Sequence, residues 1–596
     1  MRSALLRWTV LLAGCLTLSA TAVQPRAESR RFIRVNQLGY LIRAPKFAVL
    51  CTLDSLPRVT FTVRDATGRI VVRRFASSSG SFASCRSTYR LSFTELTRPG
   101  TYRIQVAGAE PATFRIGDSV YVGVADSLLV YMRQQRSGWN PVFKDSVHRY
   151  DGVVVDHPTL GGQSVKVSGG WADASDYLQY VTTSATATYA MLAALRDFPH
   201  AFADRYTANG TEGSNDVPDV LDEANHGLDW LLRMYPGGNT IFNQIADDRD
   251  HAYFDLPATD SVDYGWGKGR ARPVYPCTGK SQGLLKNKNR STGWASTAGK
   301  YASAFALAAH IQRDRNPMLA KVLRQRAEKV FALGMGHPGV CQTAPAGAPY
   351  FYEEDNWVDD MELAAAELAV DSSAQSAGLI RTALDYAARE PVTPWMGADT
   401  ASHYQWYPFV NFGHAVLSDQ VTKAQRDTLT RYYRDGIVAT VRRAKNGFRI
   451  GIPFIWCSNN LVVAFASQAM LYRAMSGDAR YREYEQAAID WLFGVNPWGV
   501  SMFIGLGTSS PRDPHSVVAD QLGVKLLTGG LVDGPVYRSI FGNLLGVRLR
   551  NEDEYATFNT GFIVYHDDLG DYSTNEPTMD GTASAVWLLA ALAPKR

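Results

Sequence analysis

Residues 217–234 read VPDVLDEANHGLDWLLRM, and this stretch decides how most of the chain folds. Leu221, Ala224 and Leu228 recur at intervals of three and four residues, which places them on one face of an α-helix. Pro218 stands near the start, where proline is favoured because its missing N–H costs a helix nothing. The stretch therefore predicts an amphipathic helix that packs through one side.

The same helical period continues through residues 118–596. We expect roughly twelve helices in all, joined by long loops rich in glycine, proline and aromatic residues. The clearest of the others cover residues 122–135, 177–195, 292–311, 357–368, 427–443, 461–475 and 480–493. Long loops inside a folded domain are usually functional. The pattern indicates a helical barrel whose active face is built from loops.

Residues 32–117 have a different pattern, with short β-branched and aromatic runs between turn signals. Residues 58–63 (RVTFTV) and 69–72 (RIVV) flank the turn ATG, and residues 101–106 (TYRIQV) follow a Pro-Gly pair. Several strands in so short a segment predict a small all-β sandwich that supports the helical domain.

Residues 1–22 resemble an export signal. Arg2 and Arg7 form a basic start, an apolar run covers residues 8–18, and Ala-Thr-Ala precedes the expected cleavage point. A second interpretation is a lipoprotein signal over residues 1–14, because Leu-Ala-Gly precedes Cys15, which would then carry a lipid anchor. Both leave an exported protein, either periplasmic, secreted or an outer-membrane lipoprotein of a bacterium. No other run reaches the ~18 apolar residues of a membrane span.

The composition excludes other classes. With 46% hydrophobic and 20% charged residues, the 596-residue chain is able to bury a large core. Its 61 basic and 57 acidic residues give a net charge of +4, too small for a protein that binds nucleic acid by neutralising phosphates. Beyond the leader, Cys51 and Cys85 are close enough in sequence to pair. Cys277, Cys341 and Cys457 are predicted to be buried or unpaired thiols, since their spacing matches no zinc motif.

The first chemical motif is GGWADASDY at residues 169–177. Asp173 and Asp176 are three residues apart, so they face the same way if a helix begins here. A helix N-terminus would favour both as anions, which is the state of a general base. Taken alone, the motif could equally be a helix cap with a solvated neighbour.

The second motif is YHDDLGDYSTNEP at residues 565–577. Glu576 lies close to Asp571, and nearby negative charge with partial burial would raise its pKa, as a general acid requires. A base-like aspartate pair and an acid-like glutamate on a scaffold rich in aromatic residues predict glycoside hydrolysis.

These motifs make the sequence similar to glycoside hydrolase family 9, the cellulase and endoglucanase family, in its subgroup with an N-terminal immunoglobulin-like domain. The resemblance covers nearly the whole mature chain. It rests on four blocks: FIRVNQLGY at 32–40, GWADASD at 170–176, PDVLDEA at 218–224 and the run at 565–578. In the second block, Ser175 stands where the family has glycine.

The resemblance implies a mainly α protein: an (α/α)6 barrel over residues 118–596, preceded by an immunoglobulin-like β-sandwich over residues 32–117. It also implies an inverting mechanism. Asp176 would be the general base that activates water, Asp173 would help to hold that water, and Glu576 would protonate the leaving oxygen.

Other site residues are assigned from the same resemblance. His515, Trp171, Tyr572, Asp571 and His251 are the predicted substrate-binding residues. Trp171 and three further tryptophans are candidates for stacking on sugars, although each alone could be a core residue. These three are Trp294, Trp357 and Trp406.

Two positions depart from the family pattern. Val517 stands where the family has arginine and Thr582 where it has asparagine. Losing a guanidinium removes a forked hydrogen-bond donor to sugar hydroxyls, so recognition near the cleavage point would be altered. No cofactor is required for the chemistry, but Asp359 and Asp360 fall where some relatives hold a structural calcium ion.

The expected function is therefore inverting hydrolysis of a β-linked glucan of the cellulose, mixed-linkage or xyloglucan type. One alternative is an exo-acting β-glucosidase or glucosaminidase on short oligosaccharides, suggested by Val517 and Thr582. Another is a non-catalytic glycan-binding protein of the cell surface.

Overall fold

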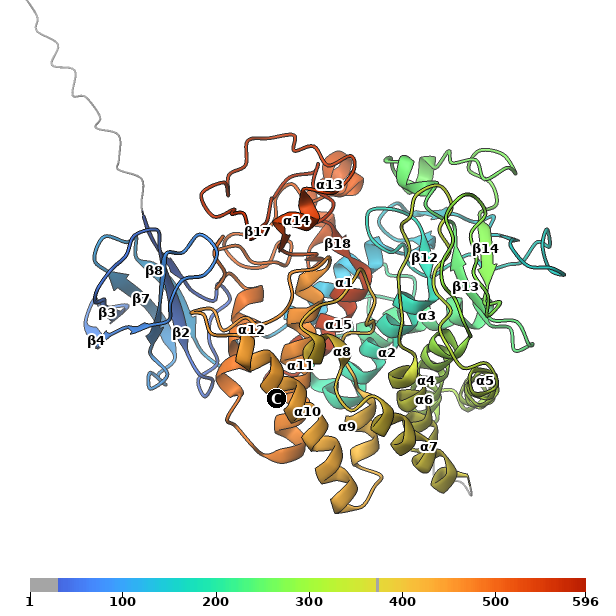
Figure 1. Cartoon of the computed structure of the whole chain (residues 1–596), viewed down its shortest axis with the longest axis horizontal. Coiled ribbons are helices and arrows are strands. Elements are labelled where there is room, and N and C mark those ends of the chain that lie inside the picture. The colour runs from blue at the N-terminus through green and yellow to red at the C-terminus, as the bar shows by residue number, and fades with distance from the viewer. Residues whose placement is uncertain (1–29, 371–374, 596) are drawn as a thin grey trace, which may run out of the picture.

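The computed structural model describes residues 30–370 and 375–595. A small β domain lies beside a larger helical domain (Figure 1). The predicted leader at 1–22, with Cys15, lies outside the described residues. No helix within the described ranges is both long and apolar enough to cross a membrane.

The β domain consists of two four-stranded sheets, with orders β1-β2-β6-β5 and β4-β3-β7-β8. Every neighbouring pair is antiparallel. Tyr40, Phe93 and Phe114 pack at the centre with ring centroids 4.6–5.6 Å apart. The predicted sandwich is confirmed. Its strands are β1 (Arg31–Arg34), β2 (Phe47–Thr52), β3 (Thr60–Asp65), β4 (Ile70–Phe75), β5 (Ser77–Ser78), β6 (Ser87–Ser92), β7 (Gly100–Val106) and β8 (Ala112–Ile116).

Two concentric layers of helices form the larger domain, as the predicted (α/α)6 barrel requires. Each inner helix contacts the next, and the ring closes where α15 packs against α2. The inner helices are α2 (Val181–Asp197), α4 (Ala295–Gln312), α6 (Val358–Ala369), α9 (Gly413–Ser418), α11 (Ser458–Ser476) and α15 (Met579–Ala590). The outer helices are α1 (Val124–Gln134), α3 (Asp219–Met234), α5 (Pro317–Gly336), α7 (Ser376–Arg389), α10 (Lys423–Arg443) and α12 (Arg482–Leu492).

The two layers differ in sequence because they differ in surroundings. The inner helix α4 is buried along almost its whole length and is rich in alanine, since it has neighbours on every side. The outer helix α10 buries only a stripe that includes Leu429, Tyr433 and Ile437. Shorter helices lie in the connections: α8 (Pro394–Ala398), α13 (Val517–Leu522), α14 (Arg538–Phe541) and the 3-10 turns Pro199–Ala201, Asp250–Ala252, Pro257–Thr259 and Val524–Leu527.

Small sheets in the loops arrange the face of the barrel that carries the two acidic motifs. Strands β12 and β13 pair antiparallel, as do β15 and β18. The helix expected from residue 177 begins only at Val181, because residues 179–180 form β12 instead. The strands of these loops are β9 (Gly138–Asn140), β10 (Asp145–Val147), β11 (Val153–Val154), β12 (Gln179–Tyr180), β13 (Phe242–Ile245), β14 (Pro273–Pro276), β15 (Leu531–Val532), β16 (Val536–Tyr537), β17 (Ile563–Val564) and β18 (Pro577–Thr578).

The cysteines form two disulfides. Cys51 and Cys85 are bonded, as predicted, where the sandwich meets the barrel. Cys277 and Cys341 are also bonded, so the prediction of unpaired thiols was wrong for them. The pairing was not predicted because the two cysteines are 64 residues apart in sequence. The fold brings together the residues that follow β14 and the turn that follows α5. Cys457 is a buried free thiol.

Candidate active site

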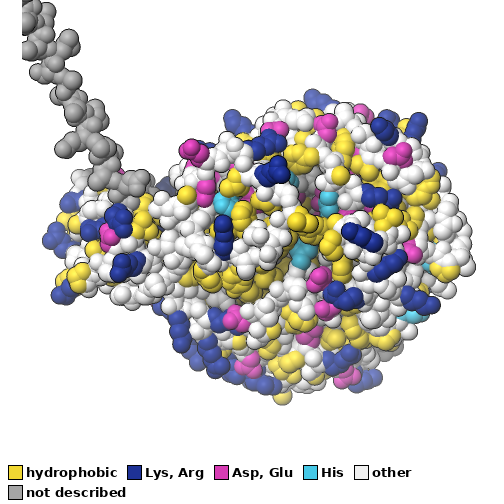
Figure 2. Space-filling view, turned by 45° about the horizontal axis from the view of Figure 1, so that its top comes forward, with side chains coloured by type: hydrophobic (Ala, Val, Ile, Leu, Met, Phe, Trp, Pro, Cys, Tyr) yellow, Lys and Arg dark blue, Asp and Glu magenta, His cyan; other side chains and the backbone are white. Residues whose placement is uncertain are grey.

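A cavity of about 420 Å³ opens on the loop face of the barrel. In Figure 2, histidine and hydrophobic side chains gather near the middle of the larger domain's face. The cavity brings together six of the predicted site residues and many aromatic ones. Its lining includes Asp173, Asp176, His251, His515, Tyr572 and Glu576, with Ser175, Tyr180, Tyr253, Phe254, Tyr350, Phe351, Tyr352, His403, Trp456, Cys457, Asp533, Leu545 and Thr578.

Asp176 and His251 meet because β12 pairs with β13, which aligns the loops that hold them. The Nε2 atom of His251 is 3.7 Å from Oδ2 of Asp176. Burial lowers the pKa of His251, but the bond to Asp176 and the charges of Asp176, Asp250 and Glu576 outweigh it and raise that pKa to about 9. His251 is therefore an imidazolium at neutral pH. The Oδ1 atom of Asp176 accepts the N–H of Leu178 at 2.9 Å, which leaves Oδ2 toward the cavity side with His251.

Asp173 lies deeper than Asp176. Its side chain is 4% exposed and accepts hydrogen bonds from the hydroxyls of Thr183, at 2.8 Å, and Tyr352. Burial and the charge of Asp176 raise the pKa of Asp173 well above its usual range. The backbone N–H of Met579, at the start of α15, donates to the Asp173 carbonyl at 2.9 Å, so the last inner helix supports this loop. The expected helical turn under the aspartate pair is absent from this described segment.

Glu576 reaches the cavity from the residue before β18. Pairing of β15 with β18 is extended by the N–H of Asp533, which donates to the Glu576 carbonyl at 2.9 Å. The Oε1 atom of Glu576 accepts the N–H of Ser175 at 2.9 Å and the Ser175 hydroxyl. Burial raises the pKa of Glu576, and the charge of Asp176 adds to this against the opposing effect of His515. Burial was predicted as a cause, but the neighbouring negative charge is that of Asp176 and not that of Asp571.

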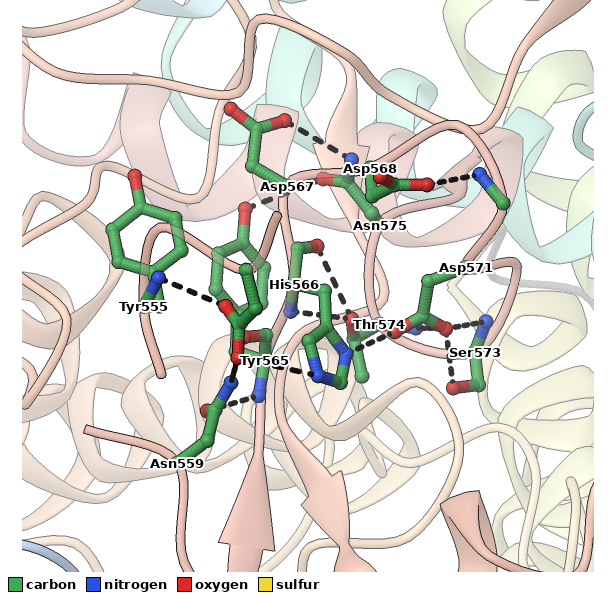
Figure 3. A network of polar contacts seen from close by, with 12 residues as sticks. Tyr555, Asn559, Tyr565, His566, Asp567, Asp568, Asp571, Ser573, Thr574 and Asn575 are labelled. Atoms are coloured by element: carbon green, nitrogen blue, oxygen red, sulfur yellow. Dashed lines mark hydrogen bonds and ion pairs between the residues drawn. The ribbon is translucent and has the colours of Figure 1, made fainter. Parts of the chain in front are cut away.

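Asp571 is a structural residue rather than a substrate contact. It is fully buried, its Oδ2 is 2.7 Å from Nδ1 of His566, and it accepts the hydroxyls of Ser573 and Thr574 at 2.6 and 2.8 Å. Figure 3 shows these bonds within the loop that precedes Glu576. In the same loop Asp567 accepts the side-chain amide of Asn575 at 3.1 Å. The predicted substrate-binding role is therefore not supported by its position.

Trp171 is also buried, with no exposed surface. Its indole N–H donates to Oε1 of Glu223 at 2.8 Å, and Arg136 pairs with the same carboxylate at 2.7 Å. The sequence block at 218–224 thus supports the first motif through Glu223. Trp171 holds the loop from behind and does not line the cavity.

Asp359 and Asp360, where calcium was expected, have partners within the protein. The Nζ atom of Lys300 is 2.6 Å from Oδ2 of Asp360 and also bonds Glu354, so an ammonium group occupies the space between these carboxylates. Asp359 accepts the side-chain amide of Asn356 at 2.9 Å. Among the described residues no cluster of three or more His, Cys, Asp or Glu side chains could hold a metal ion.

The sequence missed several residues that line the cavity. Trp456 stacks on Tyr572 with ring centroids 5.6 Å apart, and Tyr350 makes an edge-on contact with Trp456 at 6.2 Å. Neither stands in a motif, although the aromatic run at residues 350–352 was a visible signal. The three other candidate tryptophans lie elsewhere: Trp294 stacks on His337, Trp357 packs against Tyr386, and Trp406 donates to the Thr400 carbonyl.

Comparison with known proteins agrees with this geometry. Residues 121–589 match glycosyl hydrolase family 9, and residues 28–111 match the cellulase N-terminal ig-like domain. Endoglucanase C of Cellulomonas fimi is 27% identical over 97% of this chain, which spans 53% of that longer protein. A xyloglucan-specific endo-beta-1,4-glucanase of Bacteroides ovatus is 25% identical, with 98% of this chain and 97% of that protein covered.

Solved structures have the same architecture. A metagenome-derived glycoside hydrolase family 9 endoglucanase superposes with a TM-score of 0.71 and 27% identity, covering 94% of this chain and 99% of that one. The sequence blocks, the barrel with its appended sandwich, and the cavity that joins Asp176 to Glu576 lead to one conclusion. The chain belongs to glycosyl hydrolase family 9 and carries the N-terminal immunoglobulin-like domain of cellulases.

Proposed function

We propose that this glycoside hydrolase cleaves a β-linked glucan with inversion, using Asp176 as general base and Glu576 as general acid. The observation that carries the assignment is the contrast between the two carboxyl groups on one cavity. Asp176 lies beside the positive charge of His251, whereas burial raises the pKa of Glu576. An anion and a neutral acid are what inversion needs on opposite sides of the scissile bond.

The reaction follows from these states. Glu576 gives its proton to the glycosidic oxygen as the bond to the anomeric carbon breaks, and the oxygen keeps the bonding electron pair. A water molecule attacks the same carbon from the opposite face, and Asp176 takes its proton. Asp173 would help to hold that water, since it borders the same cavity next to Asp176.

The aromatic lining supports a glucan of the cellulose, mixed-linkage or xyloglucan type as the substrate. Trp456 and Tyr572 present flat rings, which suit the apolar faces of β-linked glucose units. The relatives named above include a xyloglucan-specific enzyme, so branched glucans belong in any substrate panel.

A second candidate, exo cleavage of short oligosaccharides, rests on Val517. This side chain is 2% exposed at the start of α13, where the family has an arginine. None of the residues that line the cavity is a lysine or an arginine. Viscosity measured against sugar release separates the two modes. Endo cleavage lowers the viscosity of a soluble glucan after little sugar has been released, whereas exo cleavage releases short sugars while the viscosity stays high.

We also propose that the enzyme is exported, because the leader pattern at 1–22 agrees with two disulfides in the described domains. Whether it is secreted, periplasmic or anchored through Cys15 is tested by fractionation and by mass measurement of the mature N-terminus.

Substitution of the two carboxyl groups tests the mechanism. Asp176→Ala and Glu576→Gln should each lower kcat on the best glucan at least 1,000-fold, in line with the loss of an essential proton-transfer group. Glu552→Gln, at an exposed position in a neighbouring loop, is the matched control. Near-normal hydrolysis by either variant would reject the assignment, and tight glycan binding without turnover by the wild type would favour a binding protein. Proton NMR of the first-formed anomer reports inversion.

A further inference from the structure

Ser175 makes two hydrogen bonds to one oxygen of the acid. Its backbone N–H donates to Oε1 of Glu576 at 2.9 Å, and its hydroxyl donates to the same atom. Within residues 30–370 and 375–595 no hydrogen bond to Oε2 is formed by the protein. Ser175 also directly precedes Asp176, so a single residue connects the acid to the loop of the base.

We infer that Ser175 is a positioning residue which fixes the carboxyl group of Glu576 so that Oε1 is always the acceptor and Oε2 carries the catalytic proton. This inference rests on the proposed role of Glu576 as the acid. An oxygen that accepts two hydrogen bonds has its lone pairs engaged by the donor hydrogens, which favours the proton on the other oxygen of the carboxyl group. The proton of the neutral acid is therefore on Oε2, which is free to face the glycosidic oxygen.

The Ser175 hydroxyl also acts on the charge that the reaction creates. When Oε2–H breaks, the proton goes to the leaving oxygen and Glu576 becomes a carboxylate. Hydrogen bonds to an anion are stronger than those to a neutral group, so the hydroxyl bond strengthens as the proton leaves. The bonds from Ser175 thus lower the pKa of Glu576 and offset part of the increase caused by burial.

The residue type matters because glycine stands at this position in the family's block. A glycine would keep the N–H bond and lose the hydroxyl bond. The Ser175 hydroxyl is therefore a second donor to Glu576, which a glycine at this position would not supply. Ser175→Gly removes that donor alone.

The test compares two substrates that differ in their need for an acid. Ser175→Gly and Ser175→Ala should lower kcat on a cello-oligosaccharide about tenfold, the effect of losing one hydrogen bond to a developing charge, with KM changed less than twofold. On 2,4-dinitrophenyl β-cellobioside, whose leaving group departs without a proton, kcat should stay within twofold. Ser175→Thr should restore the oligosaccharide rate.

The pH profile gives an independent readout. Loss of a donor to the ionised form raises the pKa of Glu576, so the basic limb of kcat should move to higher pH in the glycine and alanine variants. Ser402→Ala removes an exposed hydroxyl beside the cavity residue His403 and should leave both the rates and the limb unchanged.

Two results would overturn the inference: equal rate losses on both substrates, or an unchanged basic limb. Glu576→Gln, measured on the same pair of substrates, separates this from the proposed function. If that variant retains oligosaccharide hydrolysis, the acid assignment fails; if it abolishes hydrolysis while Ser175→Ala has no effect, only the role of Ser175 fails.

Discussion

Asn36 of the β-sandwich donates a hydrogen bond to Asp490 of α12, with 2.8 Å between Nδ2 and Oδ1, across the boundary of the two domains. The same amide donates to the hydroxyl of Tyr121 at 2.9 Å. Burial raises the pKa of Asp490 to about 7, against the opposing bonds from Asn36 and Gln486. Asn36, a residue of the FIRVNQLGY block, therefore connects the β-sandwich to the helical domain.

Removing this amide should destabilise the protein in a pH-dependent way. Asn36→Ala leaves a buried carboxyl group with fewer donors, so we expect a loss of about 2 kcal/mol in the free energy of unfolding. The loss should be larger at pH 8 than at pH 5, because Asp490 is ionised only above a pKa of about 7. Urea unfolding at both pH values measures it, and Thr101→Ala on an exposed position of β7 is the control. Equal losses at both pH values would contradict the account.

The His251–Asp176 pair predicts a second pH dependence. The folded pKa of His251 is about 9, above its ordinary 6.5, so its contribution to stability is fully present below about pH 6.5 and is lost as pH rises through 9. Because the imidazole is partly exposed, we expect about 1 kcal/mol. His251→Gln should lower the free energy of unfolding at pH 6 and not at pH 10. A difference that persists at pH 10 would mean that packing, and not charge, is responsible.

Trp456 and Trp171 should behave differently when truncated. Trp456→Ala removes a ring from the cavity wall and should raise KM for oligosaccharides about tenfold, with little change in stability. Trp171→Ala opens a void in the core and should cost about 3–5 kcal/mol in stability. Steady-state kinetics and thermal unfolding of both variants distinguish them, with Trp266→Ala, on an exposed loop, as the control. A KM effect confined to Trp171 would reverse the assignment.

The Cys277–Cys341 disulfide should stabilise the loop face. Replacing both residues with serine should cost about 2–4 kcal/mol, because the bond constrains a 64-residue separation in the unfolded chain. Unfolding of the variant is compared with that of the wild type in the absence of reductant. If Cys277 and Cys341 of the denatured wild type are alkylated without prior reduction, the disulfide does not form.

Lys300 should be essential to the cluster that was expected to bind calcium. Lys300→Met leaves Glu354 and Asp360 buried without their cation and should cost about 3–5 kcal/mol. Treatment with EDTA should leave the Tm of the wild type unchanged, and a fall that calcium restores would contradict this prediction.

Much of the fold could be predicted because it depends on local patterns. The period of residues 217–234 predicts α3 nearly to the residue, and alternation predicts β3 and β7. The helix predicted directly after Asp176 was wrong at its start. Residues 179–180 pair with β13, more than sixty positions away, and this pairing overrides the local helical tendency. Such a contact leaves no trace in the spacing of apolar residues.

The site residues that stand in a recognisable sequence motif could be predicted. Asp173, Asp176 and Glu576 all reach the cavity. Trp171 and Asp571 stand in the same motifs, yet they face away, because a motif also contains the residues that hold its loop in place. Trp456 and Asp533 could not be predicted as site residues from the sequence. They reach the cavity through tertiary packing of segments that carry no recognisable motif.

The ring of inner helices closes between α2 and α15, and Asp173 is bonded to the first residue of α15. The proposed base, Asp176, therefore lies in the first third of the 596 residues, whereas the proposed acid, Glu576, lies after all the inner helices except α15. A nascent or C-terminally truncated chain lacks Glu576 and the support under Asp173 alike. If Asp176 and Glu576 have the proposed roles, the two carboxyl groups come together only once the ring of inner helices has closed.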